Sequence, residues 1–156
     1  GKAIDLYYKR FVNGESNVFL DDGSIELIET KIVGSKLKKE TKEITWGQDL
    51  VFYFRFKFYK KLENFLMRII FYDKEQRPIA IIEERIEIIY LKKDEGEFYL
   101  MHDNLQMSKG IYSVDISLFK NDNEPIYRIN NILTFQVIHK DAVWPPFLLK
   151  STHKAL

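Results

Sequence analysis

The sequence has no cysteine, almost no net charge and no long hydrophobic run, and each absence excludes a class of protein. Without cysteine there can be no disulfide framework, no thiolate metal site and no cysteine nucleophile, and such a chain suits a reducing compartment. No apolar stretch approaches the roughly 18 residues that a membrane-spanning helix needs, and no signal-peptide core follows the first residue. We therefore expect a soluble protein.

The net charge of +1 comes from 24 Lys and Arg against 23 Asp and Glu. Such a balance creates no large field to attract nucleic acid or an anionic membrane, so a nucleic-acid partner is not expected. Hydrophobic residues make up 46% of the 156 positions and aromatic residues 15%. A chain of this length and composition is typical of one folded domain with a substantial core.

Catalytic motifs are also missing. The sequence has no phosphate-binding G-x-x-x-x-G-K-[ST] loop, no G-x-G-x-x-G turn and no G-x-S-x-G nucleophile elbow. His102, His139 and His153 are too scattered to predict a zinc site. Glu83 and Glu84 are adjacent strand residues that point to opposite faces, so they cannot flank one glycosidic bond. We predict a protein that is not an enzyme and that needs no cofactor or metal.

The most informative segment is residues 50–59, in which the apolar residues keep one parity. Leu50, Phe52, Phe54, Phe56 and Phe58 alternate with a second set, namely Val51, Tyr53, Arg55, Lys57 and Tyr59. Successive side chains of a strand point to opposite faces, so this pattern predicts a strand with a wall of Phe on one side and a wet aromatic and cationic surface on the other. The Phe wall needs a second apolar layer.

Further strands are predicted at 25–33, 64–72, 79–90, 97–102, 110–119 and 131–138, separated by polar turns such as 73–78 and 121–125. In the segment 110–119 the residues Tyr112, Val114, Ile116 and Leu118 are expected to face inward, which leaves Ser113, Asp115 and Ser117 outside. Short strands without a long amphipathic helix predict an all-β fold, a two-sheet antiparallel β-sandwich of immunoglobulin-like or jelly-roll topology.

Three regions follow from this pattern. Residues 1–22 are expected to form an N-terminal arm or linker with a short helix or strand in its first part, and residues 23–140 the sandwich. Residues 141–156 form a C-terminal tail whose apolar run lies around two prolines: Val143, Trp144, Pro145, Pro146, Phe147, Leu148 and Leu149. Such a run must pack on its own domain or on another subunit, and an exchange between the two copies of a dimer is one way to do so.

Two surfaces combine aromatic planes with hydrogen-bonding groups. One carries Tyr53, Arg55, Lys57 and Tyr59, with Arg68 and Tyr72 on the next strand, and the other carries Ser113, Asp115, Ser117, Thr134 and Gln136. Sugars are bound by such mixtures, because a pyranose has an apolar face that stacks on an aromatic ring and a rim of hydroxyl groups. The alternative interpretation is that these are the ordinary solvent-exposed faces of a sandwich.

Five short sequences occur in a characteristic order: DGSIEL at 22–27, WGQDL at 46–50, IIFYD at 69–73, GIYSV at 110–114 and LTFQV at 133–137. This succession resembles the C-terminal carbohydrate-binding domain of Wzt-type ATPase subunits of ABC transporters that export O-antigen polysaccharides. The resemblance covers roughly residues 20 to 140. The sequence departs from the family pattern after Asp73, where the family often has glycine and this chain has Lys74.

The resemblance implies a β-sandwich that binds the exported polysaccharide in the cytoplasm, as a homodimer, peripheral to the inner membrane. It also implies a linker, within residues 1–22, to a nucleotide-binding domain that contacts the membrane transporter subunit. Because the family's glycan sites lie on the outer face of one sheet, Arg68, Tyr72, Asp115, Ser117, Thr134 and Gln136 become candidate sugar-binding residues. Tyr53, Arg55, Lys57 and Tyr59 stay candidates for the other sheet, and Trp144, Pro145, Pro146, Phe147 and Leu148 are candidates for the dimer contact.

Two other functions remain open. One is a protein-interaction or assembly sandwich that binds no sugar, in which the aromatic strand and the apolar tail face a subunit. The other is an accessory module of a glycan-processing enzyme, which requires a catalytic domain elsewhere in the full protein.

Overall fold

The computed structural model describes residues 17–34, 39–87 and 94–156. These residues form nine strands: β1 (Val18–Asp21), β2 (Ile25–Val33), β3 (Glu43–Thr45), β4 (Leu50–Phe58), β5 (Asn64–Tyr72), β6 (Pro78–Glu87), β7 (Glu95–His102), β8 (Gly110–Lys120) and β9 (Glu124–Ile138). The described part of the chain contains no helix.

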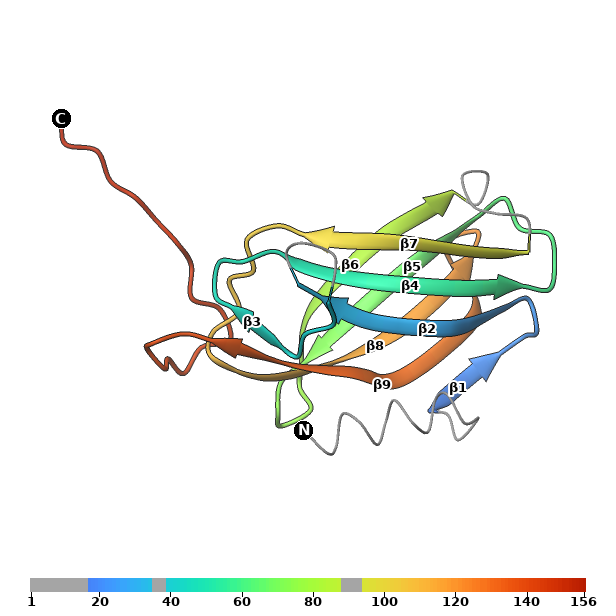
Figure 1. Cartoon of the computed structure of the whole chain (residues 1–156), viewed down its shortest axis with the longest axis horizontal. Coiled ribbons are helices and arrows are strands. Elements are labelled where there is room, and N and C mark those ends of the chain that lie inside the picture. Colours follow the sequence, from blue (N-terminus) through green and yellow to red (C-terminus); the bar gives the residue numbers. More distant parts are fainter. Residues whose placement is uncertain (1–16, 35–38, 88–93) are drawn as a thin grey trace.

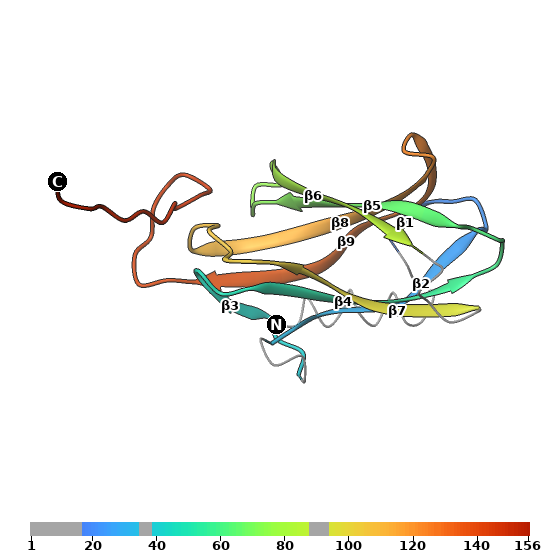
Figure 2. The same ribbon diagram turned by 90° about the horizontal axis from the view of Figure 1, so that it is seen from above.

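The strands form two sheets that pack face to face, which confirms the predicted all-β sandwich (Figures 1 and 2). The larger sheet has the order β1-β9-β8-β5-β6, and β3 joins it by pairing with β9. The smaller sheet has the order β2-β4-β7. All pairings are antiparallel except that of β3 with β9, which is a short parallel addition that the sequence pattern did not indicate.

The predicted Phe wall is the centre of the core. Phe52, Phe54 and Phe56 are fully buried on the inner face of β4, with successive rings stacked about 5.9 Å apart. Across the sandwich, Phe52 contacts Phe71 and Phe56 contacts Phe65, both from β5 of the larger sheet. Burial of a Phe side chain contributes about 1.5–3 kcal/mol, so this row alone supplies a large share of the stability.

Two predicted strands begin earlier in the structure than expected. The last strand was expected over 131–138, but β9 begins at Glu124 and runs without interruption to Ile138. β7 begins two residues earlier than expected, at Glu95. β6 covers 78–87, and the rest of its predicted strand, 88–90, lies outside the described residues. The helix or strand expected early in residues 1–22 also lies outside them.

β9 is longer than expected because a bulge, and not a turn, lies in its middle. Val114 of β8 pairs with Leu133, whereas Ile116 pairs with Ile129, so residues 130–132 stand opposite Asp115 alone. Asn131 adopts a φ of 49°, the left-handed conformation that Asn tolerates better than most residues. The paired Asn residues that look like a turn in the sequence therefore bend a continuous strand.

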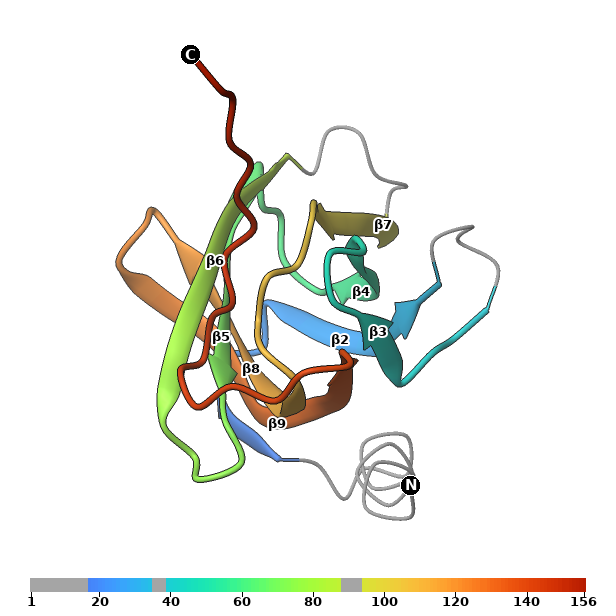
Figure 3. The ribbon, with the colours of Figure 1, turned by 90° about the vertical axis from the view of Figure 1, so that its left-hand side faces the viewer.

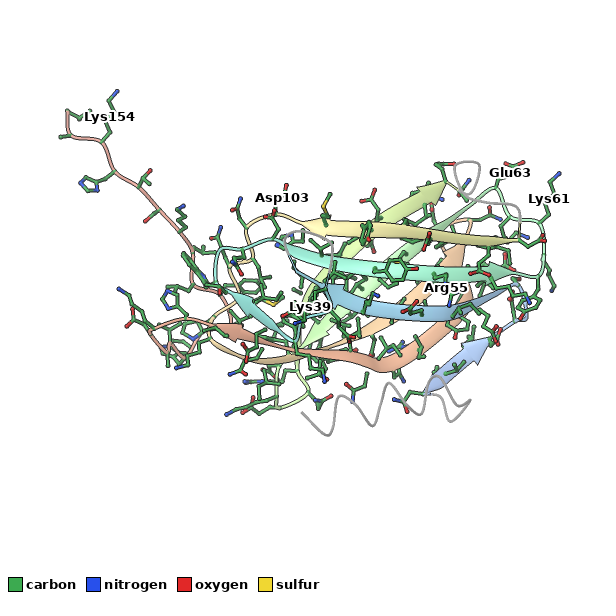
Figure 4. The ribbon with its side chains drawn as sticks, viewed as in Figure 1. Lys39, Arg55, Lys61, Glu63, Asp103 and Lys154 are labelled. Atoms are coloured by element: carbon green, nitrogen blue, oxygen red, sulfur yellow. The ribbon has the colours of Figure 1, made fainter. Side chains whose placement is uncertain are left out.

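The C-terminal tail follows β9 and crosses the end of the sandwich before leaving it (Figure 3). Phe147 forms an isolated bridge with Met107, and the Leu148 N–H donates to the Gln106 carbonyl at 2.9 Å. The indole N–H of Trp46 donates to the Leu148 carbonyl, also at 2.9 Å. Residues 151–156 extend away from the body, and Lys154 lies far from both sheets (Figure 4).

Candidate functional site on the outer face of the larger sheet

One set of predicted site residues gathers on the outer face of the larger sheet. The cross-strand pairs are Arg68 with Ser117 and Tyr72 with Ser113 between β5 and β8, and Ser113 with Thr134 between β8 and β9. Gln136 lies one row further, opposite Ile111. Residues from three adjacent strands therefore share one surface, and β8 lies in its centre.

The central strand carries three small polar residues on this face, Ser113, Asp115 and Ser117, which we call the central polar stripe. They point outward, as the sequence predicts, but only 7%, 7% and 4% of their surfaces are exposed. Their neighbours on β5 and β9 carry taller side chains, among them Tyr72 and Arg128. The small side chains of the stripe therefore lie lower than the longer side chains on the two neighbouring strands, whereas the sequence pattern alone suggested a flat patch.

Asp115 is held in place by groups from β9. Its Oδ1 accepts a hydrogen bond from the backbone N–H of Asn131 at 2.7 Å, and its Oδ2 accepts from Nη2 of Arg128 at 3.3 Å. Arg128 also donates through Nε to Oδ1 of Asn130 at 2.9 Å. The bulge therefore brings one backbone amide and one cation to a carboxylate that is otherwise hidden from solvent. These two bonds offset the desolvation cost of burying its charge.

Tyr72 borders the stripe on the β5 side. Partial burial raises the pKa of the Tyr72 hydroxyl above its ordinary value, and the negative charge of Asp115 raises it further. The hydroxyl therefore stays protonated at neutral pH and can donate a hydrogen bond. A phenol of this kind offers a ligand both a flat apolar ring and a polar tip.

Arg68 is fixed from two sides. Its Nε donates to Oε1 of Glu83 at 2.8 Å, and its guanidinium carbon lies 4.6 Å from the centre of the Phe119 ring. A bond through Nε leaves the two Nη groups of Arg68 for another acceptor. Because Arg carries five N–H donors in a rigid plane, this position suits the recognition of paired oxygen atoms.

Thr134 and Gln136 line a hollow of about 940 Å³ at the end of this face where β3 joins β9. The opposite wall comes from the segment before β3 and from β3 itself, with Thr41 and Glu43, and Ile111 of β8 closes one side. The hollow is open to solvent and combines hydroxyl, amide, carboxylate and ammonium groups with the apolar residues Ile111 and Phe135.

The second set of predicted residues lies on the outer face of the smaller sheet, where Arg55 projects from β4 (Figure 4). Most of these side chains form hydrogen bonds with carboxylates on the neighbouring strands β2 and β7. The Tyr53 hydroxyl donates to Glu97 at 2.5 Å, Arg55 donates to Glu95 at 2.7 Å, and the Tyr59 hydroxyl donates to Glu26 at 3.0 Å. Lys57 places its Nζ 5.3 Å from the centre of the Tyr59 ring.

Burial raises the pKa of Tyr53, and its bond to the Glu97 carboxylate raises it further. The bond to Glu95 likewise raises the pKa of Arg55. Charge pairing within the face contributes to both shifts, although burial is the largest cause for Tyr53. We therefore interpret this face as a self-paired, solvated surface, which leaves the larger sheet as the better candidate site.

Sequence analysis missed four residues of the candidate site: Arg128 and Asn130 of β9, Phe119 of β8 and Thr41 before β3. Arg128 could have been found, because three of the four residues at 126–129 are apolar or aromatic and directly follow the turn predicted at 121–125. Thr41 could not, since no local pattern indicates that β3 joins the far end of β9.

Neither a metal centre nor a membrane span emerges from the described ranges. Within 17–34, 39–87 and 94–156, no three His, Asp or Glu side chains come close enough together to hold a metal ion. The same residues contain no helix that is long and apolar enough to cross a membrane.

Known proteins share both the sequence pattern and the fold of this chain. The family model described as the Wzt C-terminal domain matches residues 21–144. The crystal structure of the C-terminal domain of wzt has a TM-score of 0.76 at 16% identity, and the match covers 97% of this chain and 96% of that one. A Niemann-Pick type C2 protein from Japanese carpenter ant has a TM-score of 0.51 at 15% identity, covering 78% and 99%. No curated protein sequence matches the chain significantly.

Proposed function

The chain belongs to the Wzt C-terminal domain family, and from this premise we propose that it binds an O-antigen-type polysaccharide and couples that polymer to export by an ABC transporter. The binding is not catalytic. The site is the outer face of the larger sheet, and its residues are Arg68, Tyr72, Asp115, Ser117, Arg128, Thr134 and Gln136.

The observation that carries this proposal is the central polar stripe between taller side chains. A glycan chain laid along β8 would meet hydroxyl and carboxylate groups below it, with the Tyr72 ring and the Arg68 guanidinium beside it. The aromatic ring can stack on the apolar face of a sugar, and the guanidinium and the polar groups of the stripe can bind its hydroxyl groups.

The site is shallow, and this suits transport. A polymer held in an open groove buries little surface, so its affinity stays modest and it can be released. We propose that the domain acts in the cytoplasm, peripheral to the inner membrane, and reaches the membrane transporter subunit through a nucleotide-binding domain joined to its N-terminal arm.

We also propose that the domain works as a homodimer through its tail. The tail is held by a few backbone bonds at 106–108, and Leu149 leaves 73% of its surface exposed. The same bonds can form with a second copy, because an exchanged segment reproduces every contact that it makes within one chain.

Isothermal titration with delipidated O polysaccharide from the source organism tests the site, and the chain offers a matched pair of arginines. Arg68→Ala removes a guanidinium from the larger sheet, and Arg55→Ala removes one from the smaller sheet. We expect Arg68→Ala to weaken binding about tenfold, equivalent to about 1.4 kcal/mol, and Arg55→Ala to leave it unchanged.

Each other outcome has a clear meaning. A loss confined to Arg55→Ala would move the site to the smaller sheet. If the wild-type protein binds no polysaccharide at millimolar sugar, the proposed function fails and the assembly sandwich without sugar binding becomes the better explanation. Tyr72→Phe and Tyr53→Phe form a second matched pair, in which one hydroxyl is removed from each face.

A further inference from the structure

Among the residues that the structure describes, Trp144 is the most exposed large aromatic side chain, with 95% of its surface accessible. It lines a hollow of about 300 Å³ at the end of the sandwich. The other walls are the turn between β5 and β6, with Asp73 and Arg77, and the start of β8, with Ile111. An indole offers a flat apolar face together with an N–H donor, a combination that is enriched at binding surfaces.

The position of Trp144 is fixed by the chain that follows it. Pro145 and Pro146 restrict the backbone, and Ser108 holds both, since its Oγ donates to the Pro145 carbonyl at 2.6 Å and its N–H donates to the Pro146 carbonyl at 2.9 Å. The buried Tyr112 hydroxyl donates to the Ser108 carbonyl at 2.6 Å. The tryptophan is therefore presented from an ordered backbone, which lowers the entropy lost when a ligand stacks on it.

The wall contributed by the β5–β6 turn holds a preorganised guanidinium. Nε of Arg77 donates to Oδ2 of Asp73 at 2.9 Å, while Oδ1 of Asp73 accepts the backbone N–H groups of Glu75 and Arg77, each at 3.0 Å. Those backbone bonds, together with the Arg77 side chain, lower the pKa of Asp73, so the pair stays charged. The hollow thus combines an aromatic plane with a planar donor.

Ile111 connects this hollow to the candidate site. It lines the Trp144 hollow and also the hollow that contains Thr134 and Gln136. It is the next outward residue of β8 after Ser113, so the surface continues without interruption. From Ser117 to Ile111 the strand rises about 20 Å, which is the length of a short oligosaccharide and not of one sugar.

We propose that the Trp144 hollow is a stacking subsite for one pyranose of the polysaccharide, beyond the end of the central polar stripe. The indole covers the apolar face of the ring, and Arg77 donates to its hydroxyl groups. This inference rests on the proposed function. It holds for a tail packed on its own domain and for an exchanged tail, since exchange preserves the lining.

The test is titration of the whole chain with delipidated O polysaccharide and, separately, with a short fragment of it. We expect Trp144→Ala to weaken binding of both ligands about tenfold, while Trp144→Phe keeps most of the affinity because a ring remains. Tyr59→Ala is the matched control, since Tyr59 is an exposed aromatic residue on the opposite face and its loss should change nothing.

Fluorescence gives a second measurement, because the chain has only two tryptophans and Trp46 is bonded to the tail. Binding should shift the emission of the wild-type protein to shorter wavelength, and the shift should be absent in Trp144→Phe.

Four results separate the possibilities. Reduced binding in Trp144→Ala with an unchanged oligomeric state supports the subsite. Normal binding in Trp144→Ala together with reduced binding in Arg68→Ala overturns the subsite and leaves the proposed function standing. No binding by the wild-type protein removes both. Loss of the dimer in Trp144→Ala, with unchanged affinity for the short fragment, assigns the residue to the dimer contact instead and overturns the subsite.

Discussion

At the scale of single residues, the two faces of β4 show how one strand serves two purposes. Phe54 is fully buried and contacts Phe52, Phe56 and Phe98 through its ring. Its neighbours in sequence, Tyr53 and Arg55, are only partly buried on the opposite face. The stability of the sandwich therefore depends on one parity of the strand, and its surface chemistry depends on the other.

Phe54→Ala should cost about 3–5 kcal/mol of the free energy of unfolding, since it leaves a cavity among rings that cannot close around it. Urea denaturation followed by circular dichroism measures this loss. Tyr59→Ala, at a position 55% exposed, should change stability by no more than about 0.5 kcal/mol. A small effect of Phe54→Ala would show that the Phe row is not the centre of the core.

The stability of the protein should depend on pH through the carboxylate of Asp73. Its folded pKa lies below the ordinary value of about 3.9, so the stability that its carboxylate contributes is complete above that value and is lost as the pH falls below it toward the folded pKa. Asp73→Asn should therefore lower the urea midpoint at pH 7, and the difference from wild type should shrink as the pH falls below about 4. A difference that stays constant with pH would contradict this assignment.

At the scale of elements, the bulge in β9 shapes the candidate site. Asn131 takes a left-handed conformation there, its backbone N–H binds Asp115, and its side-chain Oδ1 is buried without a partner among the described residues. The backbone conformation, and not the side chain, is what the site requires.

Substitutions at Asn131 separate these two contributions. Asn131→Gly should be as stable as wild type or more so, because glycine adopts this φ freely and no unpaired oxygen remains. Asn131→Val should lose about 1–2 kcal/mol, since a β-branched residue is strained there. Thermal unfolding of both variants provides the comparison, and an equal loss in the two would assign the role to the side chain.

The sequence predicted the limits of individual strands better than it predicted which strands and side chains lie next to one another. β2 and β5 have the predicted limits, because polar residues flank both apolar segments. Arg128 was missed because the predicted strand begins at Asn131, whereas in the structure Asn131 bends β9 without ending it. The pairing of Arg128 with Asp115 joins residues that are distant along the chain, and no local pattern encodes it.

At the scale of the whole molecule, the tail is the segment through which we propose that the domain dimerises. The isolated bridge between Met107 and Phe147 and the bond from Trp46 to Leu148 hold it to the sandwich, whereas residues 151–156 extend away from the sandwich in Figures 1 and 2. The segment just after Pro146 is therefore the part whose removal should affect assembly.

Two truncations test this. A chain that ends after Pro146 should be monomeric by light scattering and should still bind a short oligosaccharide, because Trp144 and the outer face of the larger sheet remain. A chain that ends after Lys150 should remain a dimer and serves as the control. If both are dimers, the contact lies elsewhere, and if the uncut chain is monomeric, the dimer proposal fails.

Local sequence was sufficient to predict that this chain forms strands, which side of most strands is apolar, and that Ser113, Asp115 and Ser117 face outward. These properties depend on a period of two along one strand, so neighbouring residues suffice to define them. The tertiary structure was needed to show which strands lie side by side, how deeply the stripe is covered, and that Trp144 of the tail lies beyond its end. Those features arise from contacts between residues distant in sequence, whose geometry is set by the packing of the two sheets as a whole.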